Sequence, residues 1–243
     1  MLGILECTRG LLSGSIALLM VSDLEFEPGD VDLYVPDSQE DTAIQLGIRE
    51  LGFTQTESRD ALYDNSSHIR TVHWLRKRHR KMNIMVVEGE NAAIAIFRFH
   101  STVVMNFLSS SGIYCAYPTL TLNNLAVPNS GLMICEVRTA QRCRQCFEKY
   151  RERGIRFETD PRSFPGHEIH TCSVDAECPF TVRSTEDGKG LFIELFEPTA
   201  SEAEYIAEHT YCTIWALGGP ICSGRRYHDG FSSSIRMETT TVC

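Results

Sequence analysis

The chain has 243 residues, of which 42% are hydrophobic and 23% charged. This composition is that of an ordinary globular protein, and it excludes a collagen-like rod, a coiled coil and a disordered tail. The 23 lysines and arginines are outnumbered by 32 aspartates and glutamates, which gives a formal net charge of -9. A protein that coats nucleic acid or an anionic membrane through its overall charge would be basic, so any contact with a polyanion must be local.

The most apolar stretch near the N-terminus, Leu11 to Val21, is interrupted by Ser13-Gly14-Ser15. It is too short to span a bilayer, and it lacks the basic flank and the cleavage site of a signal peptide. We therefore expect no membrane contact and a cytoplasmic or nuclear location, where the ten cysteines would be thiols or metal ligands. Secretion, with the cysteines in disulfides, is the alternative.

The first half of the chain alternates between strand and helix patterns. We predict, in order, a short strand ending at Ser13, a helix from Gly14 to about Ser22, a strand over 31–35, a helix over 38–51, strands over 69–74 and 82–87 joined by a basic turn, and helix in two pieces over 92–108.

The second half is less regular. We predict a helix from Thr139 to about Arg153, strands over 155–157, 180–183, 191–196 and 212–217, a hairpin turn at Asp187-Gly188, and a short helix over 201–208. The fold class is then α/β (α+β). We expect a core of mixed sheet and flanking helices over residues 1–137, and a smaller C-terminal α+β unit with cysteines and histidines over residues 138–243.

Three features of the first half carry chemistry: Gly14-Ser15 at a helix start, Asp30 and Asp32 two residues apart on a strand, and Asn83 on a later strand. A helix N-terminus offers backbone N–H groups and the positive end of the helix dipole to a phosphate. Residues i and i+2 of a strand project from the same face, so both aspartates can hold Mg²⁺.

This arrangement resembles the nucleotidyltransferase superfamily, which has the fold of DNA polymerase β. The segment from Val31 to Pro36 and the phrase from Ser101 to Asn106 are also similar to those of uncharacterised fungal members. The resemblance covers about residues 10 to 110. It implies that Asp30 and Asp32 bind Mg²⁺, that Gly14 and Ser15 bind a nucleoside triphosphate such as ATP, and that a nucleoside monophosphate is transferred to a hydroxyl acceptor.

The third carboxylate of the family pattern aligns with Asn83, which cannot serve as a general base. Three interpretations stay open: a slower enzyme, an enzyme that uses Glu88 or Glu90 instead, and a catalytically inactive protein that keeps the fold for binding. Asp30-Val31-Asp32 could also be a solvated strand end after a Pro-Gly turn.

Six lysines and arginines and no acid lie between His68 and Lys81. We predict that this segment, with Arg76 and Lys77 in its turn, meets the triphosphate or a nucleic-acid backbone. A nuclear-localisation patch and a positively charged hairpin tip that discourages edge-to-edge pairing are the alternatives.

The cysteines and histidines of the second half form a candidate zinc site. Zinc takes four nitrogen or sulfur ligands in a tetrahedron, and Cys143, Cys146, His170, Cys172 and Cys178 could supply them. Cys143, however, lies in a helical apolar stripe with Phe147 and Tyr150, which favours a buried thiol at that position.

Overall fold

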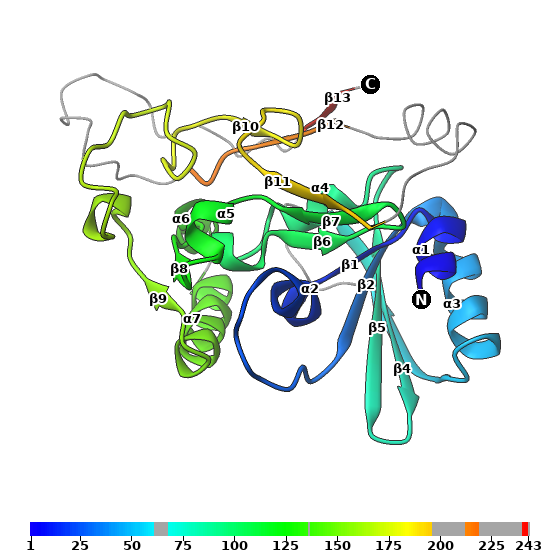
Figure 1. Ribbon diagram of the computed structural model, residues 1–243. Helices are drawn as coiled ribbons and strands as arrows, with labels where there is room; N and C mark the ends of the chain where they lie inside the picture. The colour runs from blue at the N-terminus through cyan, green and yellow to red at the C-terminus, as the bar shows by residue number, and fades with distance from the viewer. Residues whose placement is uncertain (61–67, 136, 196–211, 219–239, 243) are drawn as a thin grey trace.

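The computed structural model describes residues 1–60, 68–135, 137–195, 212–218 and 240–242 (Figure 1). The predicted helix over 201–208 lies outside these residues. The described α-helices are α1 (Leu2–Thr8), α2 (Gly14–Val21), α3 (Glu40–Arg49), α4 (Ala93–Ile96), α5 (Pro118–Thr121), α6 (Ser130–Cys135) and α7 (Val137–Glu152). Short 3-10 turns cover η1 (Asp37–Gln39), η3 (Thr102–Val104) and η4 (Pro161–Ser163).

An eight-stranded mixed sheet organises the fold, so the predicted α/β class is confirmed. Its strand order is β11-β7-β6-β1-β2-β5-β4-β3, and only β2 and β5 run parallel to each other. The strands are β1 (Leu11–Ser13), β2 (Val31–Pro36), β3 (Thr54–Asp60), β4 (Ile69–Lys77), β5 (Arg80–Val87), β6 (Asn106–Leu108), β7 (Gly112–Cys115) and β11 (Leu191–Glu194). A three-stranded sheet has the order β10 (Arg183–Ser184), β12 (Cys212–Trp215) and β13 (Thr240–Val242). A two-stranded sheet pairs β8 (Leu125–Ala126) with β9 (Arg156–Phe157).

Helices cover the sheet on both sides. Figure 1 shows α1 and α3 on one side of the β2, β5 and β4 strands, with α2 and α7 on the other. The α3 side is apolar: Leu33 and Ile84 are fully buried there, and Gly47 of α3 lets the helix approach Ile84 and Leu75. Because side chains alternate along a strand, the intervening residues of β2 and β5 face α2 and α7.

Trp215 of β12 completes a second core cluster. Its ring stacks on that of Phe97 with centroids 3.9 Å apart, and its Nε1 donates a hydrogen bond of 2.9 Å to the hydroxyl of Tyr117. All three side chains are buried. Residues from both predicted units therefore pack together here, and β11 of the second unit extends the sheet of the first along β7.

The predicted hairpin at Asp187-Gly188 is wrong. β10 pairs with β12 and β11 pairs with β7, so the two strands flanking this turn do not pair with each other. The turn exists for a local reason: the Asp187 carboxylate accepts hydrogen bonds from the side chain of Arg183 and from the backbone N–H groups of Ser184 and Lys189.

The helix predicted over 92–108 is confirmed only in part. The chain forms the single turn of α4 and the 3-10 turn η3, but its last three residues are the strand β6. The segment is buried on nearly every side, so its apolar residues show no periodicity that would separate helix from strand.

No helix in the described parts of the chain combines the length and the hydrophobicity needed to cross a bilayer.

Candidate functional site

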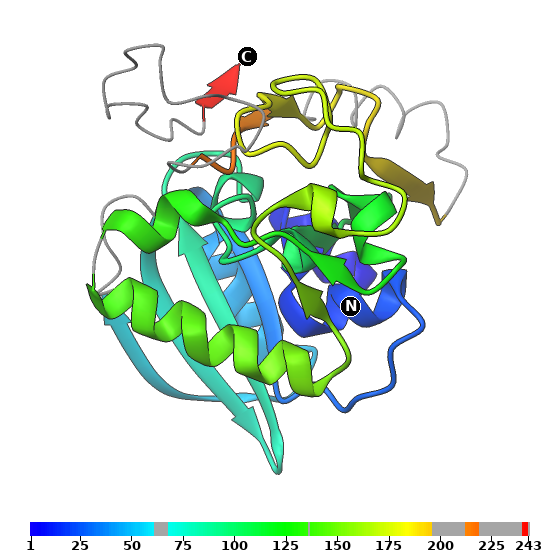
Figure 2. The same cartoon turned by 90° about the vertical axis from the view of Figure 1, so that its left-hand side faces the viewer.

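The two aspartates and Asn83 lie together where β2 and β5 pair. Figure 2 shows α7 running across these strands. β2 and β5 are parallel neighbours, and their register places Asp32 directly beside Asn83. Asp30 immediately precedes β2, one pleat repeat before Asp32. The alternation that turns Leu33, and with it the partly buried Val31, to the α3 side therefore turns both carboxylates to the opposite face.

Asn83 bridges the two carboxylates. Its Nδ2 donates a hydrogen bond of 2.7 Å to Oδ1 of Asp32 and one of 3.1 Å to Oδ2 of Asp30. The partly positive amide group thus occupies the point on which the two negative groups converge. Hydrogen bonds to charged acceptors are stronger than neutral ones, so this contact fixes the relative positions of β2, β5 and the chain before β2.

Gly14 brings the start of α2 against the same aspartate. Its φ of 70° lies in the left-handed region, and a Cβ added to it would stand 2.7 Å from Oδ2 of Asp32. A side chain at this position is excluded both by backbone strain and by the close approach. Gly14 was selected from the sequence as a phosphate-binding glycine. In the structure the packing of Asp32 also depends on it.

The first turn of α2 has no side-chain cap. Ser13, at the N-cap position, instead donates its hydroxyl to the carbonyl of Asn106 at 2.6 Å, and Ser15 is buried in the first turn. The N-terminal N–H groups of an uncapped helix are suited to an anion. Gly14 thus lies beside Asp32, and Ser15 follows it in the first turn of α2.

Burial and the neighbouring negative charge of Asp30 raise the pKa of Asp32 from 3.8 to about 6, against the opposing effects of the Asn83 hydrogen bond and the Lys149 ammonium. Two carboxylates held this close resist double ionisation. The Asp32 carboxyl therefore holds its proton more tightly than an ordinary aspartate does.

Helix α7 contributes residues that sequence analysis did not select. Lys149 is near enough to influence Asp32, and the pKa of Tyr150 is raised mainly by burial, with smaller contributions from both aspartates. His100 contacts the rings of Phe147 and Tyr150, and burial with the nearby Lys149 charge lowers its pKa to about 4, so its imidazole is neutral at pH 7. No local motif marks these residues, because long-range packing brings them to the site.

The two basic residues selected for nucleotide binding point in opposite directions. The register of β4 and β5 puts Arg76 opposite Lys81 and on the face shared by Trp74 and Asn83. Lys77, one residue further, faces the other way and donates from its ammonium to the carbonyl of Leu51 at 2.6 Å. The structure does not bring Lys77 to the aspartates.

Glu88 and Glu90 are also absent from the site. Both follow the far end of β5, and at 3.3 Å per residue Glu88 lies roughly 16 Å along the strand direction from Asn83. Glu90 accepts a hydrogen bond of 2.6 Å from Arg9. Neither residue replaces the third carboxylate in this structure.

The five predicted zinc ligands are not assembled as one site. His170, Cys172 and Cys178 lie together, with ligand atoms within 4.8 Å of one another. Cys143 and Cys146 lie on α7 outside that group, and Cys143 is buried with Phe147 and Tyr150 along one helix face. The apolar stripe explains the position of Cys143 better than metal binding does.

The chain matches no protein-family model, no curated protein and no solved structure in the comparisons made with known proteins.

Proposed function

We propose that the protein is a nucleotidyltransferase-like, Mg²⁺-dependent nucleotide-binding protein that transfers a nucleoside monophosphate from a nucleoside triphosphate to a hydroxyl acceptor. The observation that carries the proposal is the convergence of Asp30 and Asp32 on one point, with the uncapped start of α2 pressed against Asp32 at Gly14. Carboxylates and helix N–H groups side by side are suited to a cation with a bound phosphate.

The residues present fit Mg²⁺. In the structure an amide NH₂ group lies between the two carboxylates, which is where a cation would contact both. With a cation there in place of the NH₂ group, a turn of the Asn83 side chain would let its amide oxygen serve as a third oxygen ligand. Mg²⁺ prefers such ligands and retains several waters, so two carboxylates and one amide oxygen suffice.

Bound there, Mg²⁺ would neutralise charge on the triphosphate and on the departing pyrophosphate. The chain itself supplies the positioning. The N–H groups of α2 and the hydroxyl of Ser15 would hold phosphate oxygens, and Arg76, on the same face of the sheet, would meet the outer phosphates or a polyanionic acceptor. The proton of the acceptor hydroxyl cannot go to Asn83, so we expect slow transfer.

A second candidate function is nucleotide binding without turnover. The observation in its favour is Asn83 itself, whose amide hydrogen-bonds to both aspartates and has no basic atom. In that case the basic hairpin of β4 and β5, or the C-terminal unit over residues 138–243, would bind a partner.

The test is calorimetric titration of ATP and the other nucleoside triphosphates with and without Mg²⁺. We expect binding that requires Mg²⁺ and that Asp32→Asn abolishes. Asp41→Asn is the matched control, because Asp41 is an exposed aspartate on α3, on the opposite side of the sheet. Pyrophosphate release in the presence of hydroxyl acceptors then separates the two candidates. If no triphosphate binds to the wild-type protein, both are overturned.

A further inference from the structure

In the irregular segment between η4 and β10, residues 164–182, some aliphatic side chains are exposed while some polar side chains are buried. Its aliphatic residues face solvent, with exposed fractions of 91% for Ile169 and 55% for Val174. Its polar ligand-type side chains face inward: 4% of the His170 side chain is exposed, and 1% of Cys178. Cys172 is partly exposed beside them. A buried imidazole next to a buried thiol, with aliphatic groups left in water, indicates an organising interaction other than the hydrophobic effect.

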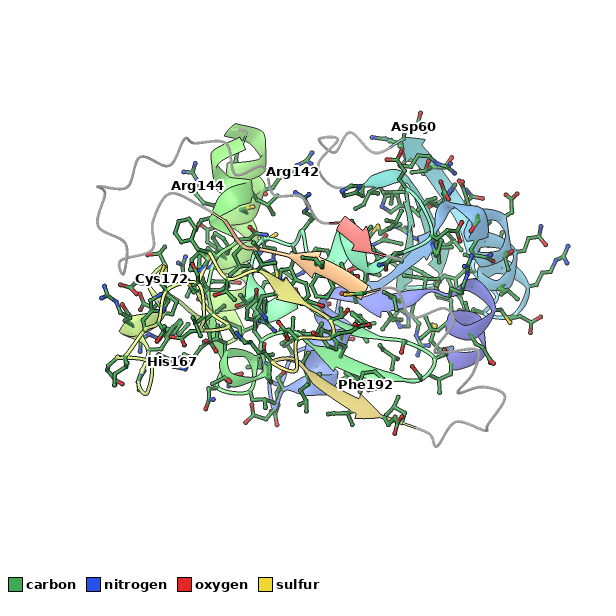
Figure 3. The ribbon with its side chains drawn as sticks, turned by 90° about the horizontal axis from the view of Figure 1, so that it is seen from above. Asp60, Arg142, Arg144, His167, Cys172 and Phe192 are labelled. Carbon is green, nitrogen blue, oxygen red and sulfur yellow. The ribbon has the colours of Figure 1, made fainter. Side chains whose placement is uncertain are left out.

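We infer that His170, Cys172 and Cys178 bind a Zn²⁺ ion that orders this segment. This inference is independent of the nucleotide site. Their spacing, His-x-Cys-x₅-Cys, places all three in one loop, which Figure 3 shows around Cys172 and His167, apart from the part of α7 that carries Arg142 and Arg144. Among the residues that the structure describes, this is the only group of three or more histidine, cysteine or acidic side chains arranged to hold a metal.

The distances suit zinc better than a disulfide. The Sγ atoms of Cys172 and Cys178 are 4.0 Å apart. Two thiolates on a tetrahedral zinc ion, each with a Zn–S bond of about 2.3 Å, stand about 3.8 Å apart. A disulfide requires about 2.05 Å, so the sulfur atoms would have to move together by about 2 Å. Little movement would be needed to close the ligands around zinc.

Neighbouring groups favour the metal-bound forms of these ligands. The backbone N–H of Ser173 lies 3.3 Å from Sγ of Cys178 and can donate to a thiolate. Oδ2 of Asp175 lies 3.7 Å from Nδ1 of His170, which gives the imidazole the kind of carboxylate neighbour that orients metal-binding histidines. One nitrogen and two sulfurs are a donor set typical of zinc, and a fourth ligand such as water would complete the coordination.

The segment has little regular secondary structure, and turn hydrogen bonds such as Cys178 N–H to the Asp175 carbonyl shape it. Between η4 and the two-residue strand β10 it contains no helix or strand. Its buried members include Cys178 and Thr181, and the Thr181 hydroxyl donates to the carbonyl of Asp175 at 2.7 Å. Metal binding commonly supplies the folding free energy of loop-rich segments with so small a core.

The experiment measures metal content of the full chain purified under reducing conditions without chelators. We expect about one zinc ion per chain, as for a single site, and thiolate-to-cobalt charge-transfer absorption after exchange into Co²⁺. Cys172→Ser should lose both signals. Cys143→Ser, the matched control in α7, should retain them.

His170 supplies a second pair of variants in case Cys172→Ser fails to fold. His170→Cys still offers a ligand and should retain the metal, whereas His170→Ala should lose it while circular dichroism confirms folding of the remainder. The inference is overturned if the wild-type chain neither contains zinc nor binds added Zn²⁺ or Co²⁺. It is equally overturned if zinc persists in folded Cys172→Ser, or if alkylation and mass spectrometry show a Cys172–Cys178 disulfide in the protein as purified.

Discussion

Replacing Asn83 with aspartate tests whether the three residues form one electrostatic unit. The substitution removes two hydrogen bonds to carboxylates and places a third negative charge where they converge. Hydrogen bonds to charged groups contribute about 1.5–3 kcal/mol each, and the added repulsion acts in the same direction. Since part of the loss is relieved by protonation and water, we expect Asn83→Asp to lower the free energy of unfolding by about 3 kcal/mol at pH 8 without Mg²⁺.

Two conditions should restore this stability. Millimolar Mg²⁺ should bind the three carboxylates and remove most of the deficit, because a ligand that binds only the folded state stabilises it. Lowering the pH to about 5 should also help, since the crowded carboxyls bind protons more tightly in the folded than in the unfolded chain. If Mg²⁺ does bind, the same variant should release pyrophosphate faster than the wild type.

The assay is urea unfolding followed by circular dichroism at pH 5 and pH 8, with and without Mg²⁺. Asn123→Asp is the control, because Asn123 is exposed and its amide donates to the carbonyl of Thr119. A loss of about 3 kcal/mol in a chain of this size corresponds to a melting temperature lower by roughly 6–12 °C. Equal stability of Asn83→Asp and wild type at pH 8 without Mg²⁺ would refute the reasoning.

Three further predictions follow from the site. The folded-state pKa of Asp32 is about 6 against an ordinary 3.8. The stability that this raised pKa contributes should therefore be fully present below pH 4 and be lost, by at most about 3 kcal/mol, as the pH rises to 7. Asp32→Asn should flatten that decline in urea-unfolding measurements, and an unchanged decline would contradict the assignment. Gly14→Ala should lower the free energy of unfolding by at least about 2 kcal/mol and abolish nucleotide binding. Gly29→Ala is the control, because nothing lies within 4 Å of its added Cβ, and it should change neither quantity in the same unfolding and titration experiments. Arg76→Met should weaken triphosphate affinity several-fold by calorimetry, and Lys77→Met should leave it unchanged; the reverse order would show that the strand register misassigns the two side chains.

The placement of Gly14, Asp30 and Asp32 close to one another could be predicted from sequence because its signals are local. Alternation along a strand decides that Asp30 and Asp32 share a face, and a glycine before an apolar helix marks the turn that approaches them. The position of Asn83 beside Asp32 required one further step, the parallel pairing of β2 with β5. The hairpin of β4 and β5 was predictable for the same reason, since its two strands are adjacent in the chain.

Features that depend on distant parts of the chain could not be predicted. Nothing in the sequence around Leu191 indicates that its strand pairs with β7, and a closer turn signal at Asp187 pointed to the wrong partner. His100 lies in an apolar run without a motif, and Lys149 is one of several basic residues in α7. Packing of that helix over the sheet face is what brings Lys149 to Asp32.

The predicted zinc ligands also divide into a local and a non-local group. Cys143-x-x-Cys146 has the more familiar local spacing, yet both residues lie on a regular helix whose apolar stripe already explains Cys143. The three residues that do converge, His170, Cys172 and Cys178, are separated by a loop whose turns set their positions. Spacing alone could not rank these two possibilities, because tetrahedral ligation is a property of positions in space.

The pairing of β11 with β7 has a consequence for the nascent chain. β7 leaves the ribosome about 75 residues before its outer partner, which at 5–20 residues per second is a delay of about 4–15 s. During that interval Ile113 and Tyr114 lie on an uncovered strand edge. The delay between the synthesis of Phe97 and that of its stacking partner Trp215 is longer still. Exposed edges of this kind pair readily with other chains. Slow translation or high expression should therefore favour aggregation of this protein, and a chaperone that shields β7 until residue 194 has emerged should suppress it.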